Sequence, residues 1–183
     1  MTRVAAIDCG TNSIRLLVAD GETQGERVIL NDLTRQMRIV RLGQGVDRTG
    51  RLAPEAIERT LAAVREYKRM IDNLGASDIR FVSTSAMRDA ENRQDFIEPV
   101  KELLGVYPEV VPGTEEAALS FAGAASSVHA YDRGKVLVVD IGGGSTEMVV
   151  GTLGKGVDAA YSADMGSVRV TEKFFAGCAS DQP

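Results

Sequence analysis

One short motif occurs twice in this chain of 183 residues, and the repetition limits the folds that the chain can adopt. Both copies read Asp-x-Gly-x-x-Ser, at residues 8–13 and at residues 140–145. Each copy follows one apolar run and precedes another, a pattern that predicts a strand, a tight turn and a second strand. The sequence therefore predicts an internally duplicated architecture with the same hairpin in each half.

The residue types in the two turns indicate anion binding. Glycine lets the backbone turn sharply, so that several amide groups face one point, and the serine hydroxyl adds a further donor. Such a concave set of donors suits a phosphate group. The expected phosphate-binding residues are Gly10, Thr11, Asn12 and Ser13 in the first copy, and Gly142, Gly143, Gly144 and Ser145 in the second.

Each motif also places an aspartate at the end of a strand, Asp8 in the first copy and Asp140 in the second. A carboxylate beside a phosphate is repulsive unless a cation lies between them, so the two aspartates predict a hard divalent ion, Mg²⁺. Glu147 follows on the strand that leaves the second turn, where it either faces the bound phosphate or points to solvent at a sheet edge. The glycine-rich turn favours the alternative in which Glu147 faces the bound phosphate.

Composition narrows the class of protein. The hydrophobic fraction of 44% and the charged fraction of 26% are typical of a globular α/β protein, and the net charge of −5 argues against non-specific nucleic-acid binding. The amino terminus has no signal-peptide core and no apolar run approaches the length of a membrane helix, which predicts a protein of the reducing cytoplasm without a membrane anchor. A single histidine leaves carboxylates as the candidate acid and base groups.

The rest of the chain alternates between strand and helix patterns, which predicts a mixed sheet covered by helices. The repeat restarts late in the chain, so we predict a first domain over residues 1–125 and a second over residues 126–183, the second too short to be whole. The expected elements are an extended stretch over 27–40, a helix from Pro54 that ends at Gly75, strands over 79–83 and 107–111, and helices over 92–104, 113–127 and 168–176.

Two further groups have both a functional and a structural interpretation. Glu115 and Glu116 open a predicted helix, where carboxylates stabilise the positive end of the dipole, yet a hydrolytic reaction also needs a general base. The residues alone do not choose between the two glutamates. Arg88 follows a strand end rich in hydroxyl groups and Arg15 follows the first turn, so each is either a phosphate contact or a surface ion pair.

Five segments, taken together, resemble the exopolyphosphatase and guanosine pentaphosphate phosphatase family. They read DCGTNSIRLLV, STSAMRDAEN, PGTEEAALS, DIGGGSTEMVV and MGSVRVTEKF, and they follow one another in the family's order from residue 8 to residue 174. The resemblance implies an actin-like, ribonuclease H-like fold of two duplicated α/β halves, each with its mixed sheet flanked by helices and each contributing a phosphate loop. Family members continue well past residue 183, so the second half is expected to be incomplete.

The resemblance also implies roles for individual residues. Glu116 resembles the family's catalytic base, Asp140 and Glu147 resemble its carboxylates that organise metal and water, and Arg88 resembles a phosphate contact. The implied reaction is hydrolysis of the terminal phosphoanhydride bond of inorganic polyphosphate with Mg²⁺. The sequence leaves open guanosine pentaphosphate as the substrate, a nucleotide-using kinase, a non-catalytic phosphate or alarmone sensor, and assembly as a homodimer.

Overall fold

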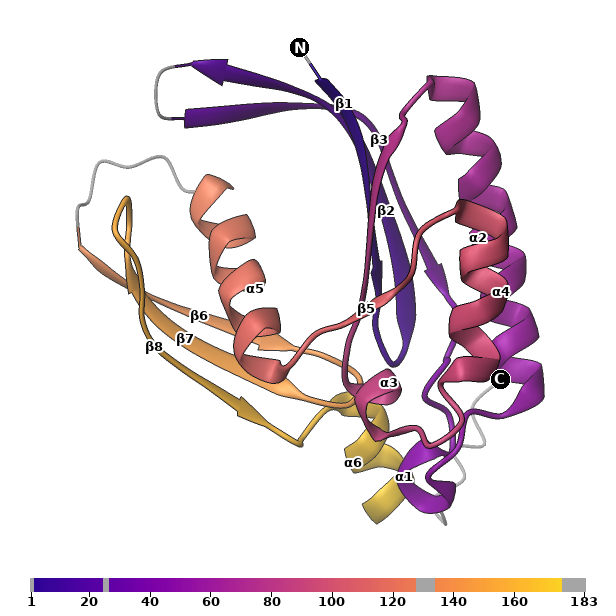
Figure 1. Ribbon diagram of the computed structural model, residues 1–183. Coiled ribbons are helices and arrows are strands. Elements are labelled where there is room, and N and C mark those ends of the chain that lie inside the picture. Colours follow the sequence, from indigo (N-terminus) through magenta and orange to yellow (C-terminus); the bar gives the residue numbers. More distant parts are fainter. Residues whose placement is uncertain (1, 25–26, 128–133, 176–183) are drawn as a thin grey trace, which may run out of the picture. The chain divides into compact units, whose positions relative to one another are not determined.

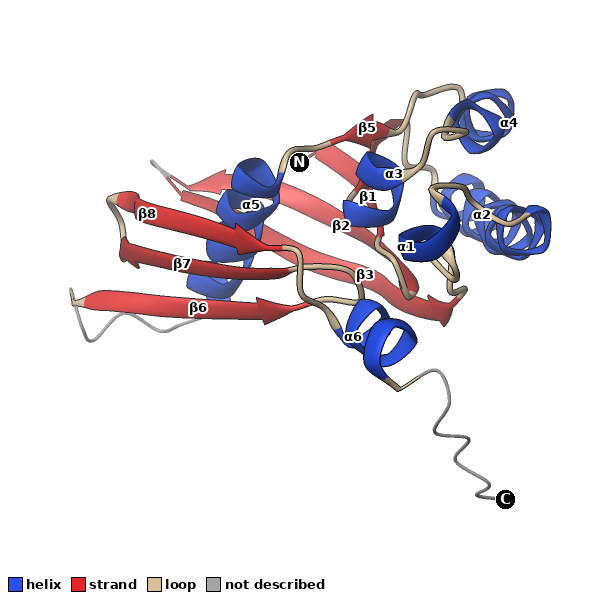
Figure 2. Ribbon diagram, turned by 90° about the horizontal axis from the view of Figure 1, so that it is seen from below, coloured by secondary structure: helices blue, strands red, loops and turns tan. Residues whose placement is uncertain are grey.

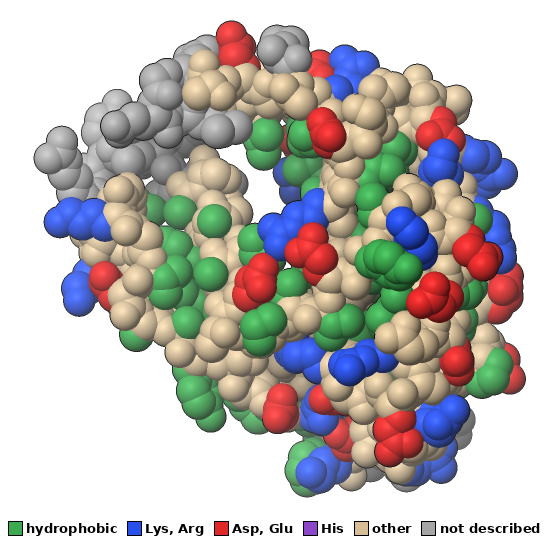
Figure 3. Space-filling model, viewed as in Figure 1, with side chains coloured by type: hydrophobic (Ala, Val, Ile, Leu, Met, Phe, Trp, Pro, Cys, Tyr) green, Lys and Arg blue, Asp and Glu red, His purple; other side chains and the backbone are tan. Residues whose placement is uncertain are grey.

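The chain forms two compact units, Met1–Val110 and Val111–Pro183, each built on its own β-sheet (Figure 1). The computed structural model describes residues 2–24, 27–127 and 134–175. In this described part, no helix is both long and apolar enough to cross a membrane. Figure 3 shows Lys and Arg side chains interspersed with Asp and Glu over the visible surface of the first unit.

The first unit contains a five-stranded mixed sheet with the strand order β3-β2-β1-β4-β5. Strand β1 pairs antiparallel with β2 and parallel with β4, and a parallel pair requires a crossover connection. Helices α1 and α2 lie in that crossover. The elements of this unit are β1 (Thr2–Cys9), β2 (Ser13–Gln24), β3 (Arg27–Ile39), α1 (Val46–Thr49), α2 (Pro54–Leu74), β4 (Asp78–Ser83), α3 (Ser85–Asp89), α4 (Gln94–Leu104) and β5 (Glu109–Val110).

Helices α2 and α4 lie on the same side of this sheet and cover its apolar face (Figure 1). Proline begins α2, where a missing amide hydrogen costs nothing, and Gly75 ends it in the left-handed conformation with φ 71°. The helix buries Val64, Tyr67 and Ile71 completely. The Tyr67 hydroxyl donates to the carbonyl oxygen of Ile14 at 2.9 Å, which satisfies its polar group inside the core.

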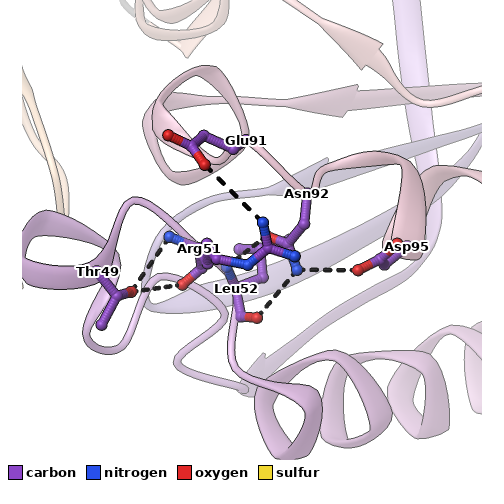
Figure 4. A network of polar contacts seen from close by, with 6 residues as sticks. All are labelled: Thr49, Arg51, Leu52, Glu91, Asn92 and Asp95. Atoms are coloured by element: carbon purple, nitrogen blue, oxygen red, sulfur yellow. Dashed lines mark hydrogen bonds and ion pairs between the residues drawn. The ribbon is translucent and has the colours of Figure 1, made fainter.

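A polar network joins the end of α1 to the segment that leads into α4 (Figure 4). The Asn92 side chain accepts a hydrogen bond from the Leu52 amide at 2.8 Å and donates to the Leu52 carbonyl oxygen at 3.2 Å. It also donates to the Asp95 carboxylate at 3.0 Å, and the Arg51 guanidinium lies 3.8 Å from the Glu91 carboxylate. The network holds the chain immediately after α3, the helix that carries Arg88.

The second unit contains a three-stranded antiparallel sheet with the order β6-β7-β8. Helix α5 packs on one face of this sheet through Ala117 and Phe121, which meet Val149 in a small core. Because α5 belongs to this core, the division between the units falls between Val110 and Val111, whereas the repeat alone placed it near residue 125. The elements are α5 (Gly113–Ser127), β6 (Lys135–Ile141), β7 (Thr146–Thr152), β8 (Gly156–Ala163) and α6 (Ser167–Phe174).

The two motif hairpins have the same backbone geometry. Asp8 pairs with Arg15 across the first hairpin and Asp140 pairs with Glu147 across the second, at equivalent positions. Both turns are closed by a 2.9 Å hydrogen bond between the third and sixth motif residues, from Gly10 to Ser13 and from Gly142 to Ser145. The register also shifts at the same place, between Val18/Ala19 and between Val150/Gly151. The predicted duplication therefore extends to hydrogen bonds and bulges.

The predicted elements are confirmed, with boundary shifts of a few residues, whereas α1, α3 and β8 were not predicted. The predicted helix over 168–176 is found as α6, and residue 176 lies outside the described residues. Helices α1 and α3, of 4 and 5 residues, are too short to show an apolar period. Strand β8 reads GVDAAYSA, in which small residues hide the alternation that identifies a strand.

Candidate functional site

The second glycine-rich loop, residues 142–145, is held by the start of α6. The Ser167 amide donates to the Gly142 carbonyl oxygen at 3.0 Å, and the Val168 amide donates to that of Gly143 at 2.8 Å. The Arg169 side chain donates from Nε to the Gly144 carbonyl oxygen at 2.8 Å. Three successive carbonyl groups of the loop thus point toward the first turn of α6.

This arrangement fixes the direction of the loop amides. In a planar trans peptide the carbonyl oxygen and the following amide hydrogen point in opposite directions. With the carbonyl groups of Gly142, Gly143 and Gly144 turned to α6, the amides of Gly143, Gly144 and Ser145 face away from α6. Successive amides on one side of a tight turn form the concave donor set that binds an anion.

The first loop is held in the same way by the chain that follows β3. The Gly43 amide donates to the Thr11 carbonyl oxygen at 2.9 Å, and the amides of Val40 and Arg41 donate to that of Asn12 at 2.9 and 2.8 Å. The amides of Asn12 and Ser13 consequently face the opposite direction.

The start of α3 supports the first loop from a second side. The buried Thr11 hydroxyl forms a 2.7 Å hydrogen bond with the Ser85 hydroxyl. Arg88 lies one helical turn after Ser85 on the same side of α3. It therefore belongs to the helix whose first residue contacts the loop.

Sequence reasoning missed two glycines that support these loops. A Cβ at Gly43 would lie 2.4 Å from Thr11 Cγ2, and a Cβ at Gly166 would lie 2.4 Å from the carbonyl carbon of Gly143. Both glycines follow the third strand of their half, but β8 has no clear strand pattern, so their common position left no signal in the sequence. Close backbone approach is the reason that each position holds glycine.

Asp140 and Glu147 come together on the face of the second sheet that α5 covers. They are directly opposed across β6 and β7, a relation that places their Cβ atoms about 4.5–5.5 Å apart. The Ser120 hydroxyl of α5 donates to Asp140 Oδ2, and the Ser162 hydroxyl of β8 donates to Glu147 Oε1 at 2.8 Å. Two adjacent carboxylates repel each other, so this pair favours a bound cation.

The interpretation of Glu147 as a solvent-facing residue at a sheet edge is wrong. Glu147 lies on the central strand of its sheet, and its side chain is 1% exposed. Its Oε2 atom is buried and has no hydrogen-bond partner among the described residues. A buried carboxylate oxygen without a donor is costly, and a cation or a water molecule at this position would satisfy it.

Glu116 lies in the first turn of α5, the helix that covers the face of the sheet on which Asp140 and Glu147 lie. The start of α5 approaches β8 so closely that a Cβ at Gly113 would lie 2.6 Å from Ser162 Oγ, and Ser162 holds Glu147. Glu116 also precedes Ser120 by one turn, on the helix side that meets Asp140. Glu116 is half-buried, whereas its neighbour Glu115 is exposed.

Asp8 and Arg15 form an ion pair of 3.6 Å at the first-copy positions equivalent to Asp140 and Glu147. The side chains are 51% and 60% exposed, a setting in which an ion pair contributes little to stability. An arginine opposite Asp8 also offsets the charge that would attract a metal, so the second copy is the better cation site. Among the described residues no group of three or more metal-binding side chains converges.

Cys9, the remaining polar residue of the first motif, lies in the core. Its side chain is 1% exposed, and burial raises the pKa of the thiol far above its ordinary value. The thiol therefore stays protonated at neutral pH. Cys9 serves as a small apolar residue of the core.

Comparison with known proteins identifies relatives along nearly the whole chain. The model of the Ppx/GppA phosphatase family matches residues 17–182. Exopolyphosphatase 2 of Mycobacterium tuberculosis is 51% identical over 181 residues, which are 94% of this chain and 55% of that protein.

Solved structures give the same result. A crystal structure of an exopolyphosphatase-like protein is 49% identical, with a TM-score of 0.87 over 93% of this chain and 53% of that one. An exopolyphosphatase from Cytophaga hutchinsonii is 30% identical, with a TM-score of 0.85 over 94% of this chain and 54% of that one. These likenesses confirm the predicted actin-like α/β fold, and the chain spans about half the length of these relatives.

Proposed function

The chain belongs to the Ppx/GppA phosphatase family, and we propose that it binds the end of an inorganic polyphosphate chain and hydrolyses the terminal phosphoanhydride bond. The observation that supports this proposal is the fixed geometry of the second loop. Its carbonyl groups accept hydrogen bonds from α6, so its amides face together away from α6. Amides fixed before the ligand arrives bind phosphate without a cost of reorganisation.

The proposed roles follow the placement of the residues. The loops of residues 10–13 and 142–145 bind phosphoryl groups through their amides and hydroxyl groups, and Arg15 and Arg88 add charge-assisted contacts. Asp140 and Glu147 would hold Mg²⁺, with Asp8 as a weaker candidate because Arg15 lies beside it. When bound, Mg²⁺ offsets phosphate charge and orients the reacting groups.

Glu116 acts as the general base in this proposal. It orients a water molecule toward the terminal phosphorus and accepts a proton as the new P–O bond forms and the bridging P–O bond breaks. The products are orthophosphate and a polyphosphate shorter by one unit. Positioning and electrostatic stabilisation supply most of the acceleration in such a transfer.

Phosphate release tests the function. We expect release from long-chain polyphosphate with Mg²⁺ and none with a chelator, and a parallel assay on guanosine pentaphosphate tests the alternative substrate of the family. Release from guanosine pentaphosphate alone would contradict the proposal. Because the chain spans about half of its relatives, binding without release is the second candidate function, and it is assigned if tripolyphosphate binds but no phosphate appears.

Removal of one carboxylate tests the cation site. In the presence of tripolyphosphate, addition of Mg²⁺ should raise the melting temperature of the wild-type chain by about 2 °C or more. A ligand that binds only the folded state stabilises that state. Glu147→Gln should lose most of this shift, because it removes the charge opposite Asp140. The matched control is Asp8→Asn, which should keep the shift. Equal loss in both variants would contradict the assignment of the site to the second copy.

A further inference from the structure

Ser162 of β8 lies directly opposite Glu147 of β7, and Glu147 lies directly opposite Asp140 of β6. Residues that are directly opposed in a sheet have their side chains on the same face. The three side chains therefore form one row across the sheet, on the face over which α5 lies (Figure 2). We call Asp140, Glu147 and Ser162 the carboxylate row. It places a hydroxyl donor beside the two carboxylates that would hold Mg²⁺.

The Ser162 hydroxyl is the hydrogen-bond donor that the described residues offer to Glu147. It donates to Oε1 at 2.8 Å, whereas Oε2 is buried without a partner in the described part of the chain. The Glu147 side chain is 1% exposed, so water from the surface does not replace a missing donor. The terminal torsion of a glutamate has broad preferences, and a bond to one oxygen restricts it. Ser162 thus determines which oxygen of Glu147 stays available.

Helix α5 limits the movement of Ser162. Gly113 begins this helix, and a Cβ on Gly113 would lie 2.6 Å from Ser162 Oγ and 2.7 Å from Ser162 Cβ. The same helix reaches the other end of the carboxylate row, where the Ser120 hydroxyl donates to Asp140 Oδ2. Because α5 contacts the row at both ends, the Ser162 hydroxyl is kept beside Glu147.

The equivalent row of the first unit has no hydroxyl group. Its members are Asp8, Arg15 and Met37, which are paired in the same register across β1, β2 and β3. The Arg15 guanidinium lies 3.6 Å from the Asp8 carboxylate and supplies it with an opposite charge. Met37 is 54% exposed and offers no donor. The donor is therefore present in the copy with two opposed carboxylates and absent from the copy in which an arginine is opposed to the aspartate.

We propose that Ser162 is a positioning residue of the cation site, which orients Glu147 so that Oε2 is left for the metal ion. The proposal rests on the proposed function, because it requires Asp140 and Glu147 to hold Mg²⁺. Carboxylates that bind metal ions are themselves held by hydrogen bonds, and loss of such a bond typically lowers metal affinity by about 10- to 100-fold. Ser162 acts through Glu147 and contacts neither the metal ion nor the phosphate.

Binding of Mn²⁺ alone tests this role, because the electron paramagnetic resonance signal of hydrated Mn²⁺ broadens when a protein binds the ion. Ser162→Ala should weaken Mn²⁺ binding by at least about tenfold relative to the wild-type chain. The matched control is Thr152→Val, which also removes a hydroxyl–carboxylate hydrogen bond between β7 and β8. That bond joins Thr152 to Asp158 Oδ2 at 3.2 Å, outside the carboxylate row, so Thr152→Val should bind Mn²⁺ as the wild type does.

Tripolyphosphate binding without a divalent ion separates positioning from general damage to the second unit. Ser162 lies outside both glycine-rich loops, so Ser162→Ala should bind tripolyphosphate within about threefold of the wild type by calorimetry. Unchanged Mn²⁺ affinity in Ser162→Ala, or equal losses of Mn²⁺ and tripolyphosphate binding, would overturn the positioning role.

The same measurements distinguish this role from the proposed function. A wild-type chain that binds no Mn²⁺ would overturn the cation site and the role of Ser162 with it. A wild-type chain that binds Mn²⁺ but releases no phosphate from polyphosphate would contradict the hydrolysis alone, and weaker Mn²⁺ binding by Ser162→Ala would then still support the positioning role.

Discussion

Glu116→Gln should reduce phosphate release from polyphosphate by about 10²- to 10⁴-fold, the usual contribution of a positioned general base. Glutamine keeps the size and the hydrogen-bonding capacity of the side chain but cannot accept the proton of the attacking water. The residue is half-buried and precedes Ser120 by one turn, and Ser120 donates to Asp140. The fold of α5 should not change, since Glu116 lies outside the core of Ala117 and Phe121.

The measurement is phosphate release together with tripolyphosphate binding by calorimetry. Binding should stay within about threefold of the wild type, because the loop amides that hold phosphate are untouched. The assay uses the chain alone. Glu115→Gln is the matched control, being an exposed carboxylate in the same helical turn. An equal loss in Glu115→Gln, or equal losses of binding and release in Glu116→Gln, would refute the role of Glu116 as base.

Gly166→Ala should weaken phosphate binding by the second loop and destabilise the second unit. A Cβ at this position would lie 2.4 Å from the carbonyl carbon of Gly143 and 2.5 Å from the amide nitrogen of Gly144. Both are backbone atoms, which cannot turn aside as the end of a flexible side chain can. Either the loop or α6 must move, and the hydrogen bonds from Ser167 and Val168 that orient the loop would be lost.

The expected destabilisation is about 1–3 kcal/mol, the usual cost of forcing an extra carbon into a packed site. Tripolyphosphate binding should weaken by at least about tenfold, since the aligned amides provide the charge-assisted contacts. Chemical unfolding and calorimetry measure the two effects. Gly134→Ala is the control, because a Cβ there meets nothing within 4 Å. A Gly166→Ala variant that binds tripolyphosphate normally would show that the contact with α6 does not orient the loop.

Much of the candidate site was predictable from sequence because its chemistry is local. A turn of Gly142, Gly143 and Gly144 between two apolar runs specifies a hairpin regardless of which elements pack against it. Pro54 and Gly75 mark the ends of α2 through their own backbone preferences. The repeated motif predicted the duplication, which the structure extends to the cross-strand pairs Asp8–Arg15 and Asp140–Glu147. The assignment of Glu116 rather than Glu115 came from family resemblance, and it stays a prediction.

By itself, then, the sequence determined the two hairpins, the principal helices and the family, because turn geometry and apolar periodicity depend on residues that are neighbours in the chain. Only the tertiary structure decided that Glu147 is buried with one oxygen unpartnered, since its exposure depends on α5 and β8, which lie far from it in sequence. The same holds for Gly43 and Gly166, whose role depends on how closely they approach the loops. The exposure of the apolar residues of β6 is decided there too: Ile7 is 2% exposed and its equivalent Val139 is 50% exposed, because burial depends on what packs over a residue.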